Sequence, residues 1–440
     1  MSIVPPSAPD SSEVRLVHPR YHGLDFIRAV MMLLGVVLHT ALAFQQQDGL
    51  WIYHDPERTP LAGLFVLSIH IFRMPIFFVM AGFFGAMLFT RKGPAIFAGH
   101  RFDRIVIPLV IGWFVLYPLL MWAISFAYTY ASQPAAGRSI LEVFSTMSWN
   151  TDSVASLPDF VAALPDFSED GPMHLWFLYY LVYYYVFFAL CTLLLRKFAR
   201  GLTLFFNRCV HSISLGALRW FRLPILMVIS LPLMFTMEDV GFDLQMDWIP
   251  LWNVLGAYAV YFGVGWVCYH HREIVGSLER FAWARLLSGL ILLAFAMISS
   301  IIWYWALLEP ESVALDDDTL SILFVVNQIV QVLSIWLLVF GLTGVCERMF
   351  RKENRTVRYL VDASYWIYLM HLPLTIFIPA CFRYWNIDGT IKMFVMMILV
   401  TIPLLITYHF LVRGTVLGVV LSGRRYPVWP LNGRNAANTE

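Results

Sequence analysis

Charged residues are scarce in this sequence. Only 13% of its 440 residues are Asp, Glu, Lys or Arg, and 59% are hydrophobic, whereas a soluble protein of this size would carry about 25% charged residues. This composition excludes an ordinary soluble globular protein and indicates a chain that crosses a bilayer repeatedly. The predicted fold class is all-α: a polytopic integral membrane protein with about ten transmembrane helices.

Cysteine and the common cofactor motifs are also scarce. The chain has 5 cysteines and no CxxC pair, so we expect neither a disulfide framework nor a structural zinc site. It has no P-loop, no GxSxG motif and no glycine-rich dinucleotide motif. We therefore expect no permanently bound cofactor, no metal site and no nucleic-acid partner. Residues 1–20 are polar and lack the apolar segment of a cleaved signal peptide.

Long apolar runs are abundant. A spanning helix needs about 20 apolar residues, and the candidate runs are 24–44, 62–90, 105–130, 173–195, 222–237, 248–269, 281–308, 320–345, 359–382 and 391–421. The fifth run is short and contains Pro224 and Pro232. We divide the chain into an N-terminal tail (1–22), a single membrane domain (23–421) and a C-terminal tail (422–440). Residues 1–20 are expected to be disordered.

The charges between these runs are distributed unevenly. If every run crosses the membrane, most Lys and Arg residues fall on one side, in the segments after the second, fourth, sixth and eighth runs. The opposite segments hold only Arg58, Arg138 and Arg383, together with most of the acidic residues. Because basic loops stay in the cytoplasm, both termini are predicted to be cytoplasmic. The long outer segment 131–171 could cover a site.

The first run carries its ionisable residues on a single face. In a helix of about 3.6 residues per turn, Asp25, Arg28, Met32, Gly35 and His39 lie along one stripe. Ionisable groups in a membrane helix usually face a cavity or a partner. A rise of about 1.5 Å per residue separates Arg28 from His39 by about 16 Å. One helix therefore places a cation near one side of the membrane and a titratable base near the other.

Further polar side chains are expected in the outer half of the membrane. They are His70 and Arg73 in the second run, His174 beside Trp176 at the start of the fourth run, and His371 after Tyr368 in the ninth run. Each has a simpler interpretation. His39 alone could be a buried histidine bonded to the backbone, and His70 with Arg73 could cap a helix end. His174 with Trp176 could be an interfacial anchor at the outer edge of its span.

Arginines gather near the inner face. Arg101 and Arg104 precede Pro108 at the predicted membrane edge and join Arg28 there, although a single loop arginine is often only a topology signal. Guanidinium groups match phosphate oxygens bidentately, so these residues could hold a phosphate-bearing donor. A histidine in the outer half could remove a proton from a hydroxyl group, and Arg73 or His70 could stabilise an oxyanion. Donor and acceptor would then meet within the membrane.

These residues, in this order, resemble the signature of the membrane acyltransferase-3 family of bacteria. The matching segments are Arg28 with His39; Arg73 with Phe77, Phe78 and Gly82; Arg101, Arg104, Ile105 and Pro108; His174, Leu175, Trp176 and Leu178; and Tyr368, Leu369 and His371. Each motif is weak alone, but together they cover nearly the whole chain. The resemblance implies transfer of an acyl group from cytoplasmic acyl-CoA to a glycan hydroxyl on the periplasmic side of the bacterial inner (cytoplasmic) membrane.

Within that family, the sequence resembles members that succinylate periplasmic glucans. The segments that carry this resemblance include 25–29, 70–74, 364–375 and Leu-Ser-Gly at 421–423. The resemblance implies succinyl-CoA as the preferred donor, acetyl-CoA as the other donor, and a periplasmic glucan as the acceptor.

The resemblance also implies that Arg28 and His39 are the paired essential residues. Together with the residue chemistry above, we expect His39 to be the general base and Arg28 to position the donor or polarise its thioester, with Asp25 in the same catalytic group. Arg101 and Arg104 are expected to bind the coenzyme phosphates, and Arg73 the succinyl carboxylate or the oxyanion. The expected acceptor-side residues are His70, His174, Trp176, Tyr368 and His371.

Several alternatives remain open at this point. The same chemistry could acetylate lipopolysaccharide or another cell-surface polysaccharide. Direct transfer is favoured, but Ser364 could form an acyl-enzyme. A proton-coupled transporter would also carry intramembrane His and Arg, although the sequence lacks the inverted repeats of many transporters. A structural scaffold would leave Arg28 and His39 unexplained.

Overall fold

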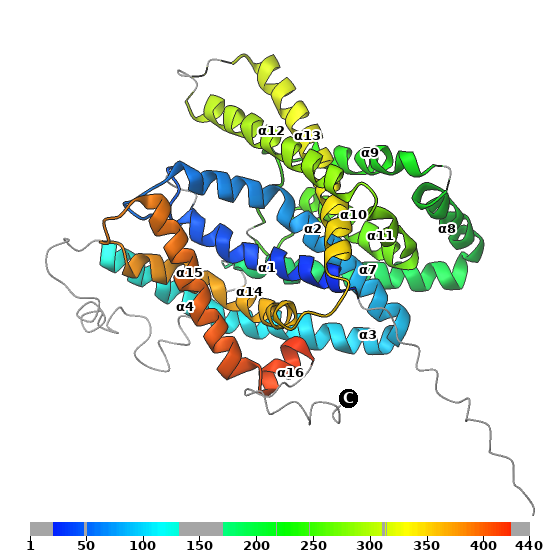
Figure 1. Cartoon of the computed structure of the whole chain (residues 1–440), viewed down its shortest axis with the longest axis horizontal. Coiled ribbons are helices and arrows are strands. Elements are labelled where there is room, and N and C mark those ends of the chain that lie inside the picture. Colours follow the sequence, from blue (N-terminus) through cyan, green and yellow to red (C-terminus); the bar gives the residue numbers. More distant parts are fainter. Residues whose placement is uncertain are drawn as a thin grey trace, which may run out of the picture.

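The computed structural model describes residues 21–47, 51–131, 170–216, 218–245, 247–309, 313 and 315–423. Within these residues every regular element is helical (Figure 1), which confirms the all-α fold class. Residues 1–20, which are predicted to be disordered, lie outside the described residues. So does nearly all of the long outer segment 131–171.

The first half of the described chain forms α1 (His22–Leu42), α2 (Pro60–Lys92), α3 (Pro94–Arg101), the π-helical turn η1 (Phe102–Val106), α4 (Ile107–Ala131), the 3-10 turn η2 (Met173–Leu175), α7 (Trp176–Phe198), α8 (Arg200–Ser214), the 3-10 turn η3 (Arg219–Phe221) and α9 (Arg222–Met234). The second half forms α10 (Trp252–His270), α11 (Glu273–Leu278), α12 (Ala282–Leu308), α13 (Asp317–Met349), α14 (Arg355–Cys381), α15 (Gly389–Thr407), the π-helical turn η4 (Tyr408–Val412) and α16 (Val416–Ser422).

Within the described residues, 8 helical segments are long and apolar enough to cross a bilayer. They account for all of the predicted runs except the fifth and the sixth. The fifth run forms α9, whose 13 residues give a helix of about 20 Å, shorter than the hydrocarbon core of about 30 Å. The sixth run forms α10, which has 19 residues but is rich in tyrosine and tryptophan. The chain is a multi-pass membrane protein, and the side on which its termini lie stays a prediction.

Capping side chains set the start of the helices that carry the polar residues. Thr59 accepts a hydrogen bond from the backbone N–H of Leu61, and Pro60 occupies the first turn of α2. Asn354 caps α14 and Asp388 caps α15 in the same way. These caps fix the register of His70, Arg73 and His371 relative to the helix ends.

Helix α1 lies at the centre of the bundle (Figure 1) and packs against α2, α13, α14 and α15. The end of the bundle where α1 and α14 begin and α2 ends carries Arg91, Arg101 and Arg351. We call it the basic end. The opposite end, where α1 ends and α15 begins, carries Asp55 and Asp388, and we call it the acidic end. The predicted orientation makes the basic end cytoplasmic.

Candidate active site

Asp25 and Arg28 form an ion pair in the first turns of α1. Arg28 Nη2 lies 3.2 Å from Asp25 Oδ1, and the two side chains are 32% and 16% exposed. The spacing of three residues places them one helical turn apart on the same face. The guanidinium carbon of Arg28 also lies 5.0 Å from the centre of the Phe84 ring, close enough for a cation–π attraction. Arg28 is therefore held by two neighbours but remains partly accessible from the basic end.

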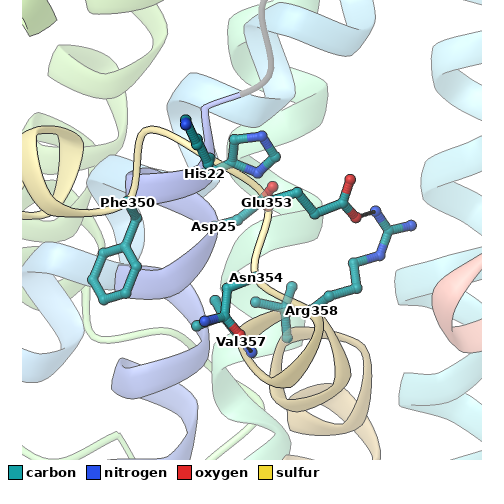
Figure 2. A pocket seen from close by; sticks show the side chains of 9 residues that line it. His22, Asp25, Phe350, Glu353, Asn354, Val357 and Arg358 are labelled. Carbon is teal, nitrogen blue, oxygen red and sulfur yellow. Dashed lines mark hydrogen bonds and ion pairs between the residues drawn. The ribbon is translucent and has the colours of Figure 1, made fainter.

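A small hollow lies beside Asp25, between the starts of α1 and α14 (Figure 2). Its volume is about 20 Å³, which is room for about one water molecule. Arg358, which lines it, is paired with Glu353 at 2.9 Å and with Asp362 at 3.3 Å. The hollow is too small for a coenzyme, and its arginine is already matched by carboxylates.

Arg101, at the end of α3, packs against aromatic side chains of α3 and α7. Its Nη2 donates to the carbonyl of Phe84 at 3.4 Å, and its guanidinium carbon lies 4.3 Å from the Tyr185 ring centre. Its Nε is buried and has no hydrogen-bond partner among the described residues. Phe84 therefore touches both Arg28 and Arg101. An anion between these two like charges would relieve their repulsion.

Arg104 lies in η1 and packs against the C-terminal end of α16. A side chain at Gly423 would overlap Arg104 Nη2, and Gly423 has φ +75°, a left-handed conformation that favours glycine. The hydroxyl of Tyr365 donates to the backbone carbonyl of Arg104 at 2.6 Å. The glycine of the Leu-Ser-Gly segment thus makes room for an arginine that the sequence analysis places in the donor site.

Histidines from α1, η2 and α14 lie together. The ring centres of His39 and His371 are 5.1 Å apart, and those of His371 and His174 are 5.2 Å apart. We call these residues the histidine cluster. Trp51 covers His39 at 5.5 Å between ring centres. The sequence predicts His174 at the outer edge of its span, whereas a hydrogen bond to Leu369 places it beside the middle of α14.

Backbone carbonyls set the tautomers of two of these histidines. His371 Nδ1 lies 2.6 Å from the carbonyl oxygen of Tyr368, and His174 Nε2 lies 3.0 Å from that of Leu369. A carbonyl only accepts, so in the neutral rings these nitrogens carry the hydrogen. His371 Nε2, His174 Nδ1 and His39 Nδ1 are buried without a hydrogen-bond partner among the described residues. The two set tautomers leave imidazole lone pairs that can accept a hydrogen bond from a hydroxyl group.

Arg73 of α2 approaches the histidine cluster across Gly35 of α1. A Cβ at Gly35 would lie 2.6 Å from Arg73 Nη1 and 3.6 Å from His371 Nε2. Arg73 Nε is buried without a hydrogen-bond partner among the described residues. Beside Gly35, a group that only donates thus faces a group that only accepts. An alcohol and an acyl carbonyl require these two kinds of partner.

The remaining predicted acceptor-side residues differ in how close they come to this cluster. The Tyr368 hydroxyl donates to the backbone carbonyl of His174 at 2.8 Å, which ties η2 to α14. His70 Nε2 lies 3.4 Å from the carbonyl of Phe242, in the segment before α10. Trp176 packs on Tyr180 and Tyr258 in the aromatic core. Tyr368 therefore belongs to the cluster. Trp176 packs in the neighbouring core, and the contact of His70 with the Phe242 carbonyl ties it to the segment before α10.

Ser364 makes a local hydrogen bond. Its hydroxyl is buried and donates to the carbonyl of Val361 one turn earlier at 2.9 Å, whereas a nucleophilic serine needs an adjacent base. Within the described ranges, no group of three or more His, Cys, Asp or Glu side chains is arranged to hold a metal ion. The arrangement offers acid–base and electrostatic chemistry.

The contacts that hold these groups in place could not be predicted from the sequence. The role of Gly35 could have been suspected from the sequence, because it lies on the stripe between Arg28 and His39. Phe84 and Tyr185, which hold the inner arginines, could not, because an aromatic residue in an apolar run is usually part of the core.

Comparison with known proteins identifies the family of this chain. The family model of the acyltransferase domain, acyltransferase-3, matches residues 21–408. The chain belongs to this family and is a membrane acyltransferase. Glucans biosynthesis protein C of Escherichia coli O139:H28 is 27% identical over 380 residues, which cover 82% of this chain and 83% of that protein. The protein of the same name from Escherichia coli strain K12 is 26% identical with the same coverage. No solved structure matches.

Proposed function

We propose that this protein transfers a succinyl group from succinyl-CoA, or another short acyl group from its coenzyme A ester, to hydroxyl groups of a periplasmic glucan. The proposed location is a bacterial inner membrane. One observation carries the proposal: Nε2 of His371, an acceptor nitrogen of the histidine cluster, and the Arg73 guanidinium meet beside Gly35. The family and the name of the glucan-related relatives support the substrate classes.

The proposed reaction is direct transfer. The glycan hydroxyl oxygen bonds to the thioester carbonyl carbon while His39, as general base, takes the hydroxyl proton. Arg73 stabilises the negative charge that develops on the carbonyl oxygen. The carbon–sulfur bond then breaks, coenzyme A leaves as a thiolate, and the proton on His39 returns to that sulfur. The hydrogen bond from the Ser364 hydroxyl to the carbonyl of Val361 favours direct transfer over an acyl-enzyme.

The donor is proposed to reach the reaction centre from the basic end. Phosphate oxygens of coenzyme A bind to Arg28, Arg101 and Arg104. Arg28 and Arg101 share Phe84 as a neighbour. Asp25 holds Arg28 in position through the ion pair at 3.2 Å. The acyl group lies along the α1 stripe toward Gly35 and His39, and the glycan approaches from the acidic end beside His174, Tyr368 and His371.

The test uses the purified full-length protein with succinyl-CoA or acetyl-CoA, and follows free thiol release with and without linear or cyclic glucans. Glucan-dependent thiol release with succinyl-CoA is expected, and replacing a general base should lower the rate by about 10²–10⁴-fold. His39→Gln is the informative variant. His409→Gln, outside the histidine cluster in η4, is the matched control and should retain the parental rate.

The opposing outcomes are distinct. A normal rate in the His39→Gln protein would refute the assignment of the base. Thiol release only with acetyl-CoA and another polysaccharide would favour the acetyltransferase alternative. A protein that consumes no acyl-CoA but moves a solute in liposomes would be a transporter.

A further inference from the structure

Helix α8 lies across the direction of the long helices. It connects α7 to α9, and Figure 1 shows it at the end of the bundle where α7 ends, running crosswise to α1, α2 and α7. Its 15 residues give a length of about 22 Å, too short to span a hydrocarbon core of about 30 Å. Its direction and length therefore fit a helix parallel to the membrane plane.

One face of α8 is apolar and exposed. Leu202, Phe205 and Phe206 share that face at helical spacing and are 56%, 63% and 57% exposed. Phe198, just before α8, is 72% exposed, and Trp220, just after it, is 75% exposed. Large aromatic side chains exposed in a cluster mark a surface that meets an apolar phase. Tryptophan beside such a surface is typical of the membrane interface.

The charges around this face are all of one sign. The segment carries Arg196, Lys197, Arg200, Arg208, Arg219 and Arg222, and no acidic residue occurs between Asp170 and Glu238. Arg222 forms hydrogen bonds within the protein. Its Nη1 donates to Ser277 Oγ at 3.1 Å, and its Nε donates to the carbonyl of Ile213 at 3.3 Å. This tie fixes the end of α8 to α11. Arg196, Lys197 and Arg208 are exposed.

We propose that α8, with Phe198 before it and Trp220 after it, is an in-plane membrane anchor whose basic residues bind the headgroups of anionic lipids. The apolar side chains enter the acyl-chain boundary while the cations meet the lipid phosphates, as in other interfacial amphipathic helices. Charge complementarity selects an anionic lipid surface as the occupant over a neutral one. The anchor would hold the end of α7 at headgroup depth, on the same helix whose middle carries Tyr185 beside Arg101.

The experiment measures amide hydrogen exchange of residues 200–222 in the full-length protein. The protein is placed in nanodiscs of phosphatidylcholine alone or of equal parts phosphatidylcholine and phosphatidylglycerol. Exchange in α8 is expected to be several-fold slower in the anionic discs, while α1 and α14 exchange equally in both. The triple variant K197Q/R208Q/R219Q should lose the difference between the two lipids. The charge-preserving variant K197R/R208K/R219K should keep it.

Other outcomes overturn the proposal. Equal exchange of α8 in the two lipids, or the same lipid effect in the triple glutamine variant, would mean that its cations do not bind anionic headgroups. Protection of α8 only in discs that hold two protein copies would instead identify a second chain as the cover of the apolar face. Because exchange in α1 and α14 reports folding in each sample, a misfolded variant is recognised and replaced by the single variant Arg208→Gln.

Discussion

Lys392 and Asp55 form an ion pair that is closed to solvent. Lys392 Nζ lies 2.8 Å from Asp55 Oδ1, and both side chains have 0% exposure. The same amine donates to the carbonyl of Arg383 at 3.2 Å, and the backbone N–H of Glu57 donates to Asp55 Oδ1 at 2.9 Å. The pair therefore joins the segment between α1 and α2 to the start of α15. That segment also carries Trp51, which covers His39.

Removing one charge of this pair is expected to destabilise the protein more than removing both charges. Lys392→Met leaves a buried carboxylate unpaired and is expected to lower the free energy of unfolding by about 3–5 kcal/mol. The double variant Lys392→Met/Asp55→Asn removes both charges and should recover most of that loss. Thermal unfolding of the parent, both single variants and the double variant in one detergent completes the cycle. Additive effects of the two substitutions would contradict a direct pair.

The turn before α10 predicts a pH dependence. Burial, with the nearby carboxylates of Asp243 and Glu238, raises the pKa of Asp239. A folded-state pKa above the unfolded one means that the stability contributed by the protonated group is complete at low pH and is lost as the pH rises through the folded value. Asp239→Asn should therefore stabilise the protein at neutral pH, by only a few tenths of a kcal/mol because solvent screens this half-exposed site.

The control for this pH effect is Asp243, which accepts hydrogen bonds from the backbone N–H groups of Glu238 and Asp239 and from Asn253 Nδ2. Asp243→Ala should destabilise the turn. Unfolding curves over a pH series should show the advantage of Asp239→Asn shrinking as the pH falls through the folded pKa and vanishing below about pH 4, where the parental carboxyl becomes protonated in both states. An advantage that grows on acidification would have the wrong sign.

Glycines define the contact between α2 and α10. A side chain at Gly82 would overlap the carbonyl oxygen of Phe262, and one at Gly265 would overlap that of Val79. Small residues that let helix backbones approach closely are typical of membrane interfaces. Gly82→Ala should therefore abolish correct folding, seen as loss of the monodisperse peak in size-exclusion chromatography. Gly63→Ala, on the same helix with no atom within 4 Å of its Cβ, should fold normally.

The parts of this structure that the sequence could predict are those set by local patterns. The stripe on α1 and the apolar runs follow from helical periodicity within about 20 residues. The pair of Lys392 with Asp55 could not be predicted, because 337 residues separate its members and the lysine lies inside an apolar run. The position of His174 beside the middle of α14 depends likewise on a long-range bond to Leu369. Run lengths alone also overestimated α9, which has only 13 residues and ends at Met234, before the end of the run at 237.

Gly35 offers a test of the candidate site that leaves the backbone intact. A methyl group there would press on Arg73 Nη1, at 2.6 Å, but would make an ordinary contact with His371 Nε2, at 3.6 Å. The end of a flexible side chain can move, so Gly35→Ala should fold and displace only the guanidinium. We expect kcat for acyl transfer to fall about 10–100-fold, in line with a displaced oxyanion donor. Arg73→Gln should cause a similar loss, and combining the two should add little, because both remove one interaction. These losses are measured as thiol release at saturating acyl-CoA, with Gly63→Ala as the control. Fully multiplicative losses in the double variant would show that Gly35 acts through something other than Arg73.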